Sequence, residues 1–287
     1  MPAAPARVRV VCVVYHPGPE LDEFAASLAA ATSAPGGVDL VLVDNGTDQD
    51  RSRAVAQAHG ARLLVPGTNL GYGAAANLGA QGGEEPWLVV CNADLVWRPG
   101  SLDQLLAAAD EHPEAGSLGP ALLNPDGSVY PSGRELPSLT QGAGHALFGR
   151  VWPRNPWTRA YQARQQTAGR KRAAGWLSGA CLLLRREAFE AVGGFDEGYF
   201  MFFEDVDLGE RLGRAGWTNL YLPQVAVMHI GGTSWRERPA SMIRAHHASA
   251  YRYLARRYDR WYQAPVRLTV RAGLAVRRTV ELRAARR

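Results

Sequence analysis

The first hundred residues alternate between short apolar runs and amphipathic stretches. Four runs, at residues 8–15, 39–43, 62–65 and 87–91, have the length and apolar character of buried strands. Leu21, Phe24 and Leu28 recur at helical spacing after the first run. Buried strands that alternate with helices are typical of a doubly wound α/β fold with a mostly parallel sheet. The pattern therefore predicts a Rossmann-like central sheet flanked by helices.

The regular alternation ends after residue 124, at an Asn-Pro-Asp-Gly turn. No acid occurs between Glu135 and Glu187, where several arginines accompany Trp152 and Trp157. We interpret this stretch as a long loop or a helical insertion. The elements predicted beyond it are a strand at 176–184, a helix at 187–192, a helix from about 204, strands at 217–222 and 225–229, and a helix at about 239–258.

The net charge of +5 is concentrated near the C-terminus. Residues 266–287 contain seven arginines and one acid, so this segment carries +6 and the rest of the chain −1. Valines and leucines are interleaved with the arginines, which favours a helix lying on an anionic membrane surface. A solvated basic tail is the alternative. Nucleic-acid binding is not indicated, because no recognised nucleic-acid-binding motif accompanies the tail.

The lengths of the apolar runs and the spacing of the cysteines argue against a membrane-spanning, secreted or disulfide-rich protein. No run approaches the roughly 20 apolar residues of a membrane span, and none has the length of a secretory signal. We therefore expect a cytoplasmic or peripherally attached protein. The three cysteines Cys12, Cys91 and Cys181 lie in apolar runs without C-x-x-C spacing, which predicts reduced core thiols and no disulfide framework or zinc site.

Several polar residues follow the predicted strands. Asp44 and Asp94 stand at the carboxyl ends of two strands, where ligands of such sheets bind. Turn formation and capping are the ordinary alternatives for these two acids. His229 ends another apolar strand, and a lone histidine there is more often a core residue than a metal ligand. Together with Asp94 it becomes a candidate ligand for a divalent cation bridging a diphosphate.

The segment from Asn69 to Asn77 is rich in glycine and alanine and enters a predicted helix. It predicts either a tightly packed glycine turn or a backbone that approaches a nucleotide closely, with amide donors at a helix N-terminus.

Three acids follow an aromatic run at the start of the helix predicted from residue 204. Asp207 and Arg211 have the i, i+4 spacing of an ion pair on the helix surface. Glu204 and Asp205 therefore remain as candidates for acid–base chemistry.

The order and spacing of these motifs resemble those of family 2 glycosyltransferases with the GT-A fold. The resemblance rests on Asp44, the Asn69–Asn77 segment, the Asn92-Ala93-Asp94 triplet, and the motifs at 176–180, 193–197 and 204–217. Nearly the whole chain is similar to the actinobacterial branch that adds rhamnose to polyprenyl-diphospho-N-acetylglucosamine, including residues 126–132, 152–157 and 245–247. The resemblance implies a GT-A domain at 1–238, with a nucleotide-binding half at about 1–124 and an acceptor half at about 125–238. A helical basic segment at 239–287 would associate with the membrane.

The resemblance also assigns roles to individual residues. Asp205 would be the general base, with Glu204 as the substitute candidate, and Asp94 and His229 would hold Mg²⁺ or Mn²⁺. Residues expected to bind the donor are Asp44, Asn45, Asn69, Gly71, Asn77 and Asn92, with Asp44 accepting a hydrogen bond from the thymine or uracil ring. Residues expected to bind the acceptor are Trp176, Ser178 and Gly179. Asn92 replaces the first acid of the commoner Asp-x-Asp motif, so we expect weak metal binding that depends on the diphosphate.

The function implied by the resemblance is an inverting, metal-dependent hexosyltransferase. It would transfer L-rhamnose from dTDP-β-L-rhamnose to N-acetylglucosaminyl-diphospho-polyprenol, in α-1,3 linkage, during synthesis of the cell-wall arabinogalactan linker. The enzyme would work on the inner face of the plasma membrane. One alternative is a family 2 enzyme that uses another nucleotide sugar in cell-surface polysaccharide synthesis. Another is a non-catalytic nucleotide-sugar-binding membrane scaffold, which would be expected to lack Asp94, Asp205 or His229.

Overall fold

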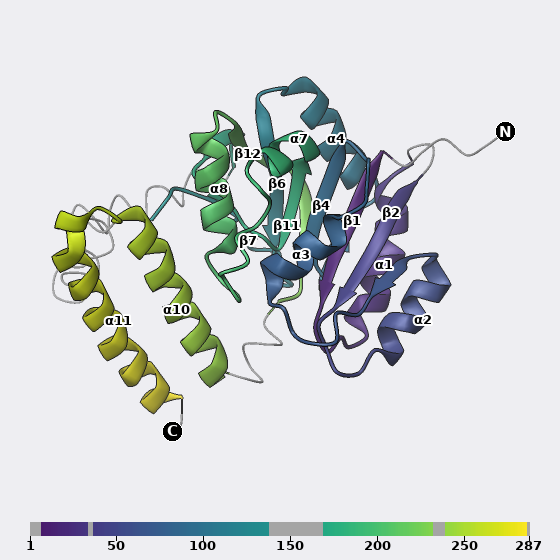
Figure 1. The fold of residues 1–287 in the computed structure, drawn as a ribbon. Helices are drawn as coiled ribbons and strands as arrows, with labels where there is room; N and C mark the ends of the chain where they lie inside the picture. Colours follow the sequence, from purple (N-terminus) through teal and green to yellow (C-terminus); the bar gives the residue numbers. More distant parts are fainter. Residues whose placement is uncertain (1–6, 34–36, 138–168, 232–238, 286–287) are drawn as a thin grey trace.

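The computed structural model describes residues 7–33, 37–137, 169–231 and 239–285, and its fold is shown in Figure 1. The strands are β1 (Val8–Val14), β2 (Val38–Asp44), β3 (Arg62–Leu64), β4 (Trp87–Asn92), β5 (Leu95–Trp97), β6 (Ala115–Leu123), β7 (Val129–Tyr130), β8 (Gly133–Arg134), β9 (Arg172–Ala174), β10 (Trp176–Leu177), β11 (Cys181–Arg185) and β12 (Thr218–His229). The helices are α1 (Glu20–Ala31), α2 (Asp50–His59), α3 (Tyr72–Ala80), α4 (Ser101–Glu111), α7 (Arg186–Ala191), α8 (Glu204–Arg214), α10 (Pro239–Arg257), η1 (Trp261–Gln263) and α11 (Ala264–Ala284).

One sheet with the strand order β3-β2-β1-β4-β11-β6-β12-β5 forms the centre of the molecule. The pairs β3–β2, β2–β1, β1–β4 and β6–β12 are parallel, whereas β11 is antiparallel to both of its neighbours. The prediction of a mostly parallel α/β sheet is confirmed. The four strands predicted in the first hundred residues are β1 to β4, each within one or two residues of the expected bounds.

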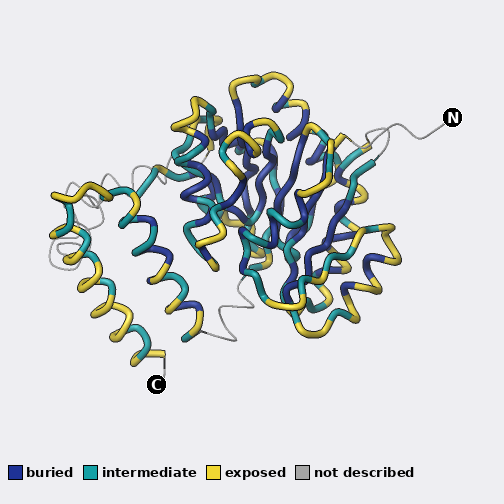
Figure 2. The backbone as a smooth tube through the Cα atoms, in the orientation of Figure 1, coloured by how far each residue is buried: buried dark blue, intermediate teal, exposed yellow. Residues whose placement is uncertain are grey.

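Helices cover both faces of the sheet because its central strands are apolar on both sides. Val10 and Cys12 of β1 pack on one face, with α1, α2 and α4. Val11 packs on the other face, with α3, α7 and α8. Burial is accordingly concentrated in the strands and on the inner sides of the helices (Figure 2). All three cysteines are buried, as predicted, and each is free.

The second half of the sheet departs from the predicted elements in several places. The strand expected at 176–184 is two strands, β10 and β11, because the chain turns at residues 178–180. The two strands expected at 217–229 are one strand, β12, whose register shifts between Leu222 and Ala226. Strand β6 was not predicted, because its glycines and proline hide the apolar pattern of a buried strand.

The C-terminal helices form an α10–α11 hairpin beside the sheet domain (Figure 1). Helix α10 buries Met242, Ile243 and Tyr253, whereas α11 has no buried residue. The basic segment predicted between Glu135 and Glu187, with Trp152 and Trp157, lies mostly outside the described residues.

Candidate functional site

A cavity of about 380 Å³ lies at the carboxyl ends of β1 and β4, where the sequence placed the ligand site. The glycine segment before α3 and the first residues of α8 complete its wall. The predicted site residues that line the cavity are Asn45, Asn69, Gly71, Asn92, Asp94, Ser178, Gly179, Glu204, Asp205 and His229. The predicted site residues absent from its lining are Asp44, Asn77 and Trp176.

Asp44 is fully buried at the end of β2 and uses both carboxylate oxygens within the protein. Its Oδ1 accepts the Gly46 N–H at 2.7 Å, and its Oδ2 accepts the Ser52 hydroxyl at 2.5 Å. These bonds close the turn after the strand and leave the adjacent Asn45 at the cavity. A hydrogen bond from Asp44 to a nucleotide base stays a prediction.

Asn77 and Trp176 support the site from behind its wall. The Asn77 amide accepts the Phe195 N–H and donates to the Phe195 carbonyl, both at 2.9 Å, so it joins α3 to the loop before α8. The Trp176 indole donates to the Glu135 carbonyl at 3.1 Å. Direct contacts of these two residues with substrate also stay predictions.

The glycine segment is held against the loop that precedes α8. Asn45 donates to the Gly71 carbonyl at 3.0 Å, and Tyr72 N–H donates to the Phe200 carbonyl at 3.0 Å. Gly71 has a φ of +85°, and a Cβ there would collide with the Phe200 carbonyl oxygen. A glycine is required because only a residue without a side chain allows this close approach.

Asp94 and His229 face each other at one end of the cavity. Asp94 Oδ2 accepts the Gly231 N–H at 3.0 Å, whereas the buried Oδ1 lies 3.2 Å from His229 Nε2 and has no hydrogen-bond partner within the described residues. Burial opposes ionisation, but the interactions with His229 and with the Gly231 N–H hold the pKa of Asp94 below its usual range. The site therefore presents an ionised carboxylate beside an imidazole.

This pair fits a divalent cation. Two ligands about 2.1 Å from an ion and at right angles are about 3 Å apart, close to the observed separation of the Asp94 and His229 donor atoms. Among the described residues, no cluster of three or more His, Cys, Asp or Glu side chains could hold a metal ion. The protein would thus supply two ligands, and oxygen atoms of the substrate or water would supply the others.

Asp205 and Glu204 stand at the first turn of α8, directly after an unusual turn. Phe202 and Phe203 have φ values of 68° and 67°, a left-handed conformation that costs bulky residues about 1–3 kcal/mol each. Asp205 Oδ2 accepts the Gly179 N–H at 2.9 Å. The strained turn and this bond fix the Asp205 carboxylate at the cavity.

The two adjacent acids lie in surroundings that favour different protonation states. Burial and the neighbouring Asp205 charge raise the pKa of Glu204 to about 8. Burial also raises the pKa of Asp205, but the N–H groups of Gly179 and Val206 favour its ionised form. Glu204 therefore holds the proton, and Asp205 is the carboxylate available to accept one.

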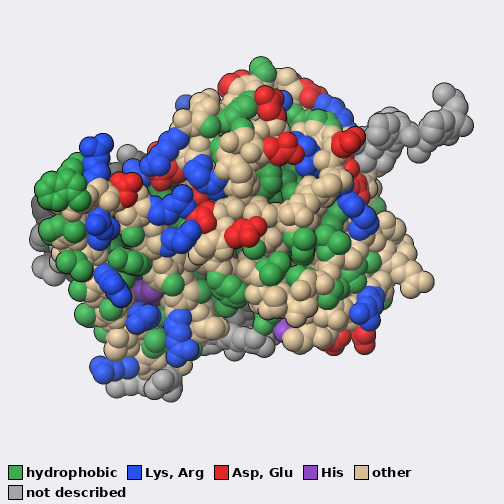
Figure 3. Space-filling model, in the orientation of Figure 1, with side chains coloured by type: hydrophobic (Ala, Val, Ile, Leu, Met, Phe, Trp, Pro, Cys, Tyr) green, Lys and Arg blue, Asp and Glu red, His purple; other side chains and the backbone are tan. Residues whose placement is uncertain are grey.

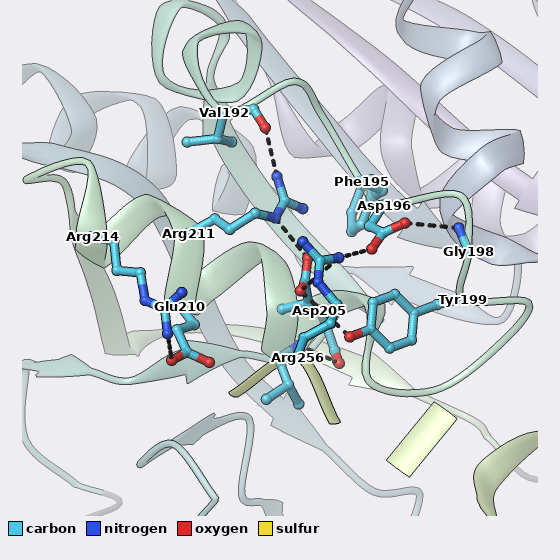
Figure 4. Close-up of polar contacts among 12 residues, drawn as sticks. Val192, Phe195, Asp196, Gly198, Tyr199, Asp205, Glu210, Arg211, Arg214 and Arg256 are labelled. Atoms are coloured by element: carbon cyan, nitrogen blue, oxygen red, sulfur yellow. Dashed lines mark hydrogen bonds and ion pairs between the residues drawn. The ribbon is translucent and has the colours of Figure 1, made fainter. Parts of the chain in front are cut away.

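The ion pair predicted between Asp207 and Arg211 is present, with Arg211 Nε 2.6 Å from Asp207 Oδ2. Asp207 is buried, however, so its predicted place on the helix surface was wrong. Arg211 also donates to the Val192 carbonyl, which explains the burial, because the pair joins α8 to the end of α7 (Figure 4).

Residues that the sequence analysis missed complete the cavity. They include His16 after β1, Tyr72 at the start of α3, Tyr130 on β7 and Met242 on α10. The Tyr72 hydroxyl donates to the Gly179 carbonyl at 2.5 Å and so connects the glycine segment to the turn that bonds Asp205. His16 was detectable as a polar residue at a strand end. Met242 had no sequence feature that placed it near the other residues.

Comparison with known proteins identifies the family. Residues 5–264 match the family described as glycosyltransferase like family 2. The chain is 50% identical to N-acetylglucosaminyl-diphospho-decaprenol L-rhamnosyltransferase of Mycobacterium tuberculosis, over 97% of this chain and 94% of the relative.

Solved structures agree with the fold. The mannosyltransferase PcManGT from Pyrobaculum calidifontis, solved in complex with GDP-Man and Mn²⁺, matches with a TM-score of 0.58 and 19% identity, over 99% of this chain and 75% of that one. GalNAc-T7, solved with UDP, GalNAc and Mn²⁺, matches with a TM-score of 0.58 and 15% identity, over 79% of this chain and 44% of that one. The predicted fold and the prediction of a hexosyltransferase are confirmed: the chain belongs to glycosyltransferase family 2 and has the GT-A fold.

Proposed function

We propose that this protein transfers L-rhamnose from dTDP-β-L-rhamnose to N-acetylglucosaminyl-diphospho-polyprenol, with inversion, to form an α-1,3 linkage in the arabinogalactan linker of the cell wall. The observation that carries the proposal is the 50% identity to the mycobacterial rhamnosyltransferase across nearly the full length of both chains. Asp205 and the Asp94–His229 pair line the same cavity, so the groups needed for a single displacement lie together.

Asp205 acts as the general base. Its carboxylate accepts the proton of the acceptor hydroxyl while that oxygen attacks the anomeric carbon, a contribution of roughly 10²–10⁴-fold to the rate. The N–H groups of Gly179 and Val206 orient the carboxylate without neutralising it. Glu204 holds its own proton at neutral pH and is therefore a poor substitute base.

Asp94 and His229 would hold Mg²⁺ or Mn²⁺ together with the donor diphosphate. When bound, the cation neutralises the negative charge that develops on the departing nucleoside diphosphate. Asn92 Nδ2 lies 3.2 Å from His229 Nε2, the nitrogen that would bind the cation, so the Asn92 amide would have to move away when the cation binds. Because the described residues offer only two ligands here, metal affinity should be low until the diphosphate binds.

The remaining predicted residues form the parts of the cavity that contact the donor and the acceptor. Asn45, Asn69 and Gly71 bind the nucleotide part of the donor, with Asp44 and Asn77 maintaining their geometry. Ser178 and Gly179 lie beside Asp205 and contact the acceptor sugar, which suits a base that must reach the acceptor hydroxyl.

We also propose that the α10–α11 hairpin rests on the anionic inner face of the plasma membrane. Leu268, Val276 and Val280 are each at least 60% exposed on α11, and arginines flank them in the sequence. Apolar and basic side chains are intermixed on the visible face of the α10–α11 hairpin (Figure 3). Trp261, 85% exposed at the start of η1, suits the head-group region. None of the described helices has the length and apolar character to cross a membrane. An interfacial helix fits this distribution because arginines reach phosphates while apolar side chains enter the interface.

A donor panel with NMR analysis of the product tests the enzymatic proposal. Purified protein is incubated with Mg²⁺ or Mn²⁺, a prenyl-diphospho-N-acetylglucosamine and either dTDP-β-L-rhamnose or a UDP-hexose. The expected product carries an α-linked rhamnose at O-3. A β-linkage, or turnover with the UDP-hexose alone, would contradict the proposal and favour a family 2 enzyme with another donor.

A further inference from the structure

Arg134 is a rigidly held arginine on β8, next to the candidate active site. Its strand pairs with β10, opposite Trp176, and its Nε donates to the Pro131 carbonyl at 2.7 Å. The guanidinium carbon lies 5.2 Å from the ring centroid of Tyr130 and 5.5 Å from that of Trp176. Two aromatic rings and one hydrogen bond therefore fix the guanidinium group.

The charge of Arg134 has no acidic partner within the described part of the chain. Within the described residues, Arg134 donates one hydrogen bond, from Nε, so that both of its terminal nitrogens can donate to a ligand. Arg9 and Arg186, by contrast, are paired with Asp39 and Glu85. A half-buried guanidinium group that is already fixed and has no carboxylate partner is suited to bind an anion, because little side-chain entropy is lost on binding.

Arg134 lies on the side of the cavity that holds the base. Its neighbour Tyr130 lines the cavity, and Trp176 begins the segment that leads to Gly179, whose N–H bonds Asp205. The charge of Arg134 also acts on Asp205 and favours the ionised form of that carboxylate. The diphosphate of the donor is expected at Asp94 and His229, so an anion bound at Arg134 would belong to the other substrate.

We propose that Arg134 binds the diphosphate of the lipid-linked acceptor, with Trp176 and Tyr130 holding its guanidinium plane in place. This inference rests on the proposed function, because that acceptor carries a diphosphate on the sugar that is glycosylated. One sugar ring separates this diphosphate from the hydroxyl that Asp205 deprotonates. Planar guanidinium donors match the oxygens of a diphosphate in a bidentate arrangement. Trp176 thereby contributes to acceptor binding indirectly.

Kinetics with two acceptors test the proposal. One acceptor is a short-chain prenyl-diphospho-N-acetylglucosamine, and the other is an alkyl glycoside of N-acetylglucosamine, which lacks the diphosphate. Arg134→Gln should raise KM for the diphosphate acceptor about 10- to 100-fold, the loss typical of a charge-assisted contact. KM for the nucleotide sugar should stay within about twofold. The ratio kcat/KM should fall at least about fivefold less for the alkyl glycoside than for the diphosphate acceptor, because only the effect of the Arg134 charge on Asp205 applies to the alkyl glycoside. Arg134→Lys should recover part of the affinity, because it keeps the charge but loses the planar group.

Arg62→Gln serves as the matched control, since Arg62 is an exposed arginine on the distant strand β3. Equal losses on both acceptors, no change on either, or a raised KM for the nucleotide sugar in Arg134→Gln would overturn the assignment of Arg134. The melting temperature of each variant shows whether a loss of activity is caused by misfolding. If Arg134→Gln is misfolded, the kinetics of Arg134→Lys are compared with those of the wild-type protein instead. Failure of the wild-type protein to transfer to the diphosphate acceptor would instead refute the proposed function.

Discussion

Glu204→Gln should change how the stability of this protein depends on pH. Glu204 is 7% exposed, and its Oε2 has no hydrogen-bond partner within the described residues. Its pKa is raised from 4.5 to about 8, chiefly by burial and then by the charge of Asp205. Glutamine has nearly the same shape and remains neutral at every pH, so the substitution removes the titration and little else.

The sign and size of the effect follow from the difference in pKa between the folded and unfolded chains. Between pH 4.5 and about 8 the folded protein keeps a proton on Glu204 that the unfolded chain has lost. The stability conferred by this proton is complete below pH 4.5 and is lost as the pH rises through about 8. At about 1.4 kcal/mol per pH unit, the full change is on the order of 5 kcal/mol.

Urea unfolding at pH values from 5 to 9 measures this change. We expect the free energy of unfolding of the wild-type protein to fall, relative to that of Glu204→Gln, by several kcal/mol across this range. Glu23→Gln is the matched control, because Glu23 also lies in the first turn of a helix but is exposed. If wild type and Glu204→Gln showed the same dependence on pH, Glu204 would not be protonated in the folded protein, and the assignment of the proton within the acid pair would fail.

Three further predictions concern the metal site, the glycine segment and the membrane surface. Asp94→Ala should weaken both donor binding and turnover, whereas Asp205→Asn should bind the donor normally and lose transfer by at least about 10²-fold. Calorimetric titration measures donor binding, and rate assays measure transfer. Near-normal transfer by Asp205→Asn would refute the role of Asp205 as base. Gly71→Ala should destabilise the protein by at least about 1–3 kcal/mol, because its Cβ would meet the Phe200 carbonyl; an unchanged urea midpoint would contradict this. A chain ending at Pro265 lacks α11 and should lose most of its salt-sensitive sedimentation with anionic vesicles while still transferring to a short soluble acceptor; equal sedimentation of both chains would exclude α11 as the membrane contact.

Much of the candidate site was predictable because the functional residues of an α/β sheet lie at the carboxyl ends of its strands. Asp94 was recognised from its place after an apolar run, and Glu204 and Asp205 from their position behind an aromatic segment at a helix start. Both inferences depend on neighbouring residues only. Strand β6 and the contribution of Met242 were missed, because glycine and proline obscure the strand and α10 reaches the cavity only through folding.

Local periodicity and residue type predict the fold class, the strand ends that carry polar residues and the acids at the start of α8. Tertiary structure decided which of those residues meet in one cavity. It buried Asp44 behind the wall, placed Trp176 beneath Arg134 and brought Asp94 next to His229, 135 residues further along the chain. It also raised the pKa of Glu204, because the burial of this carboxyl group and the approach of Asp205 exist only in the folded protein.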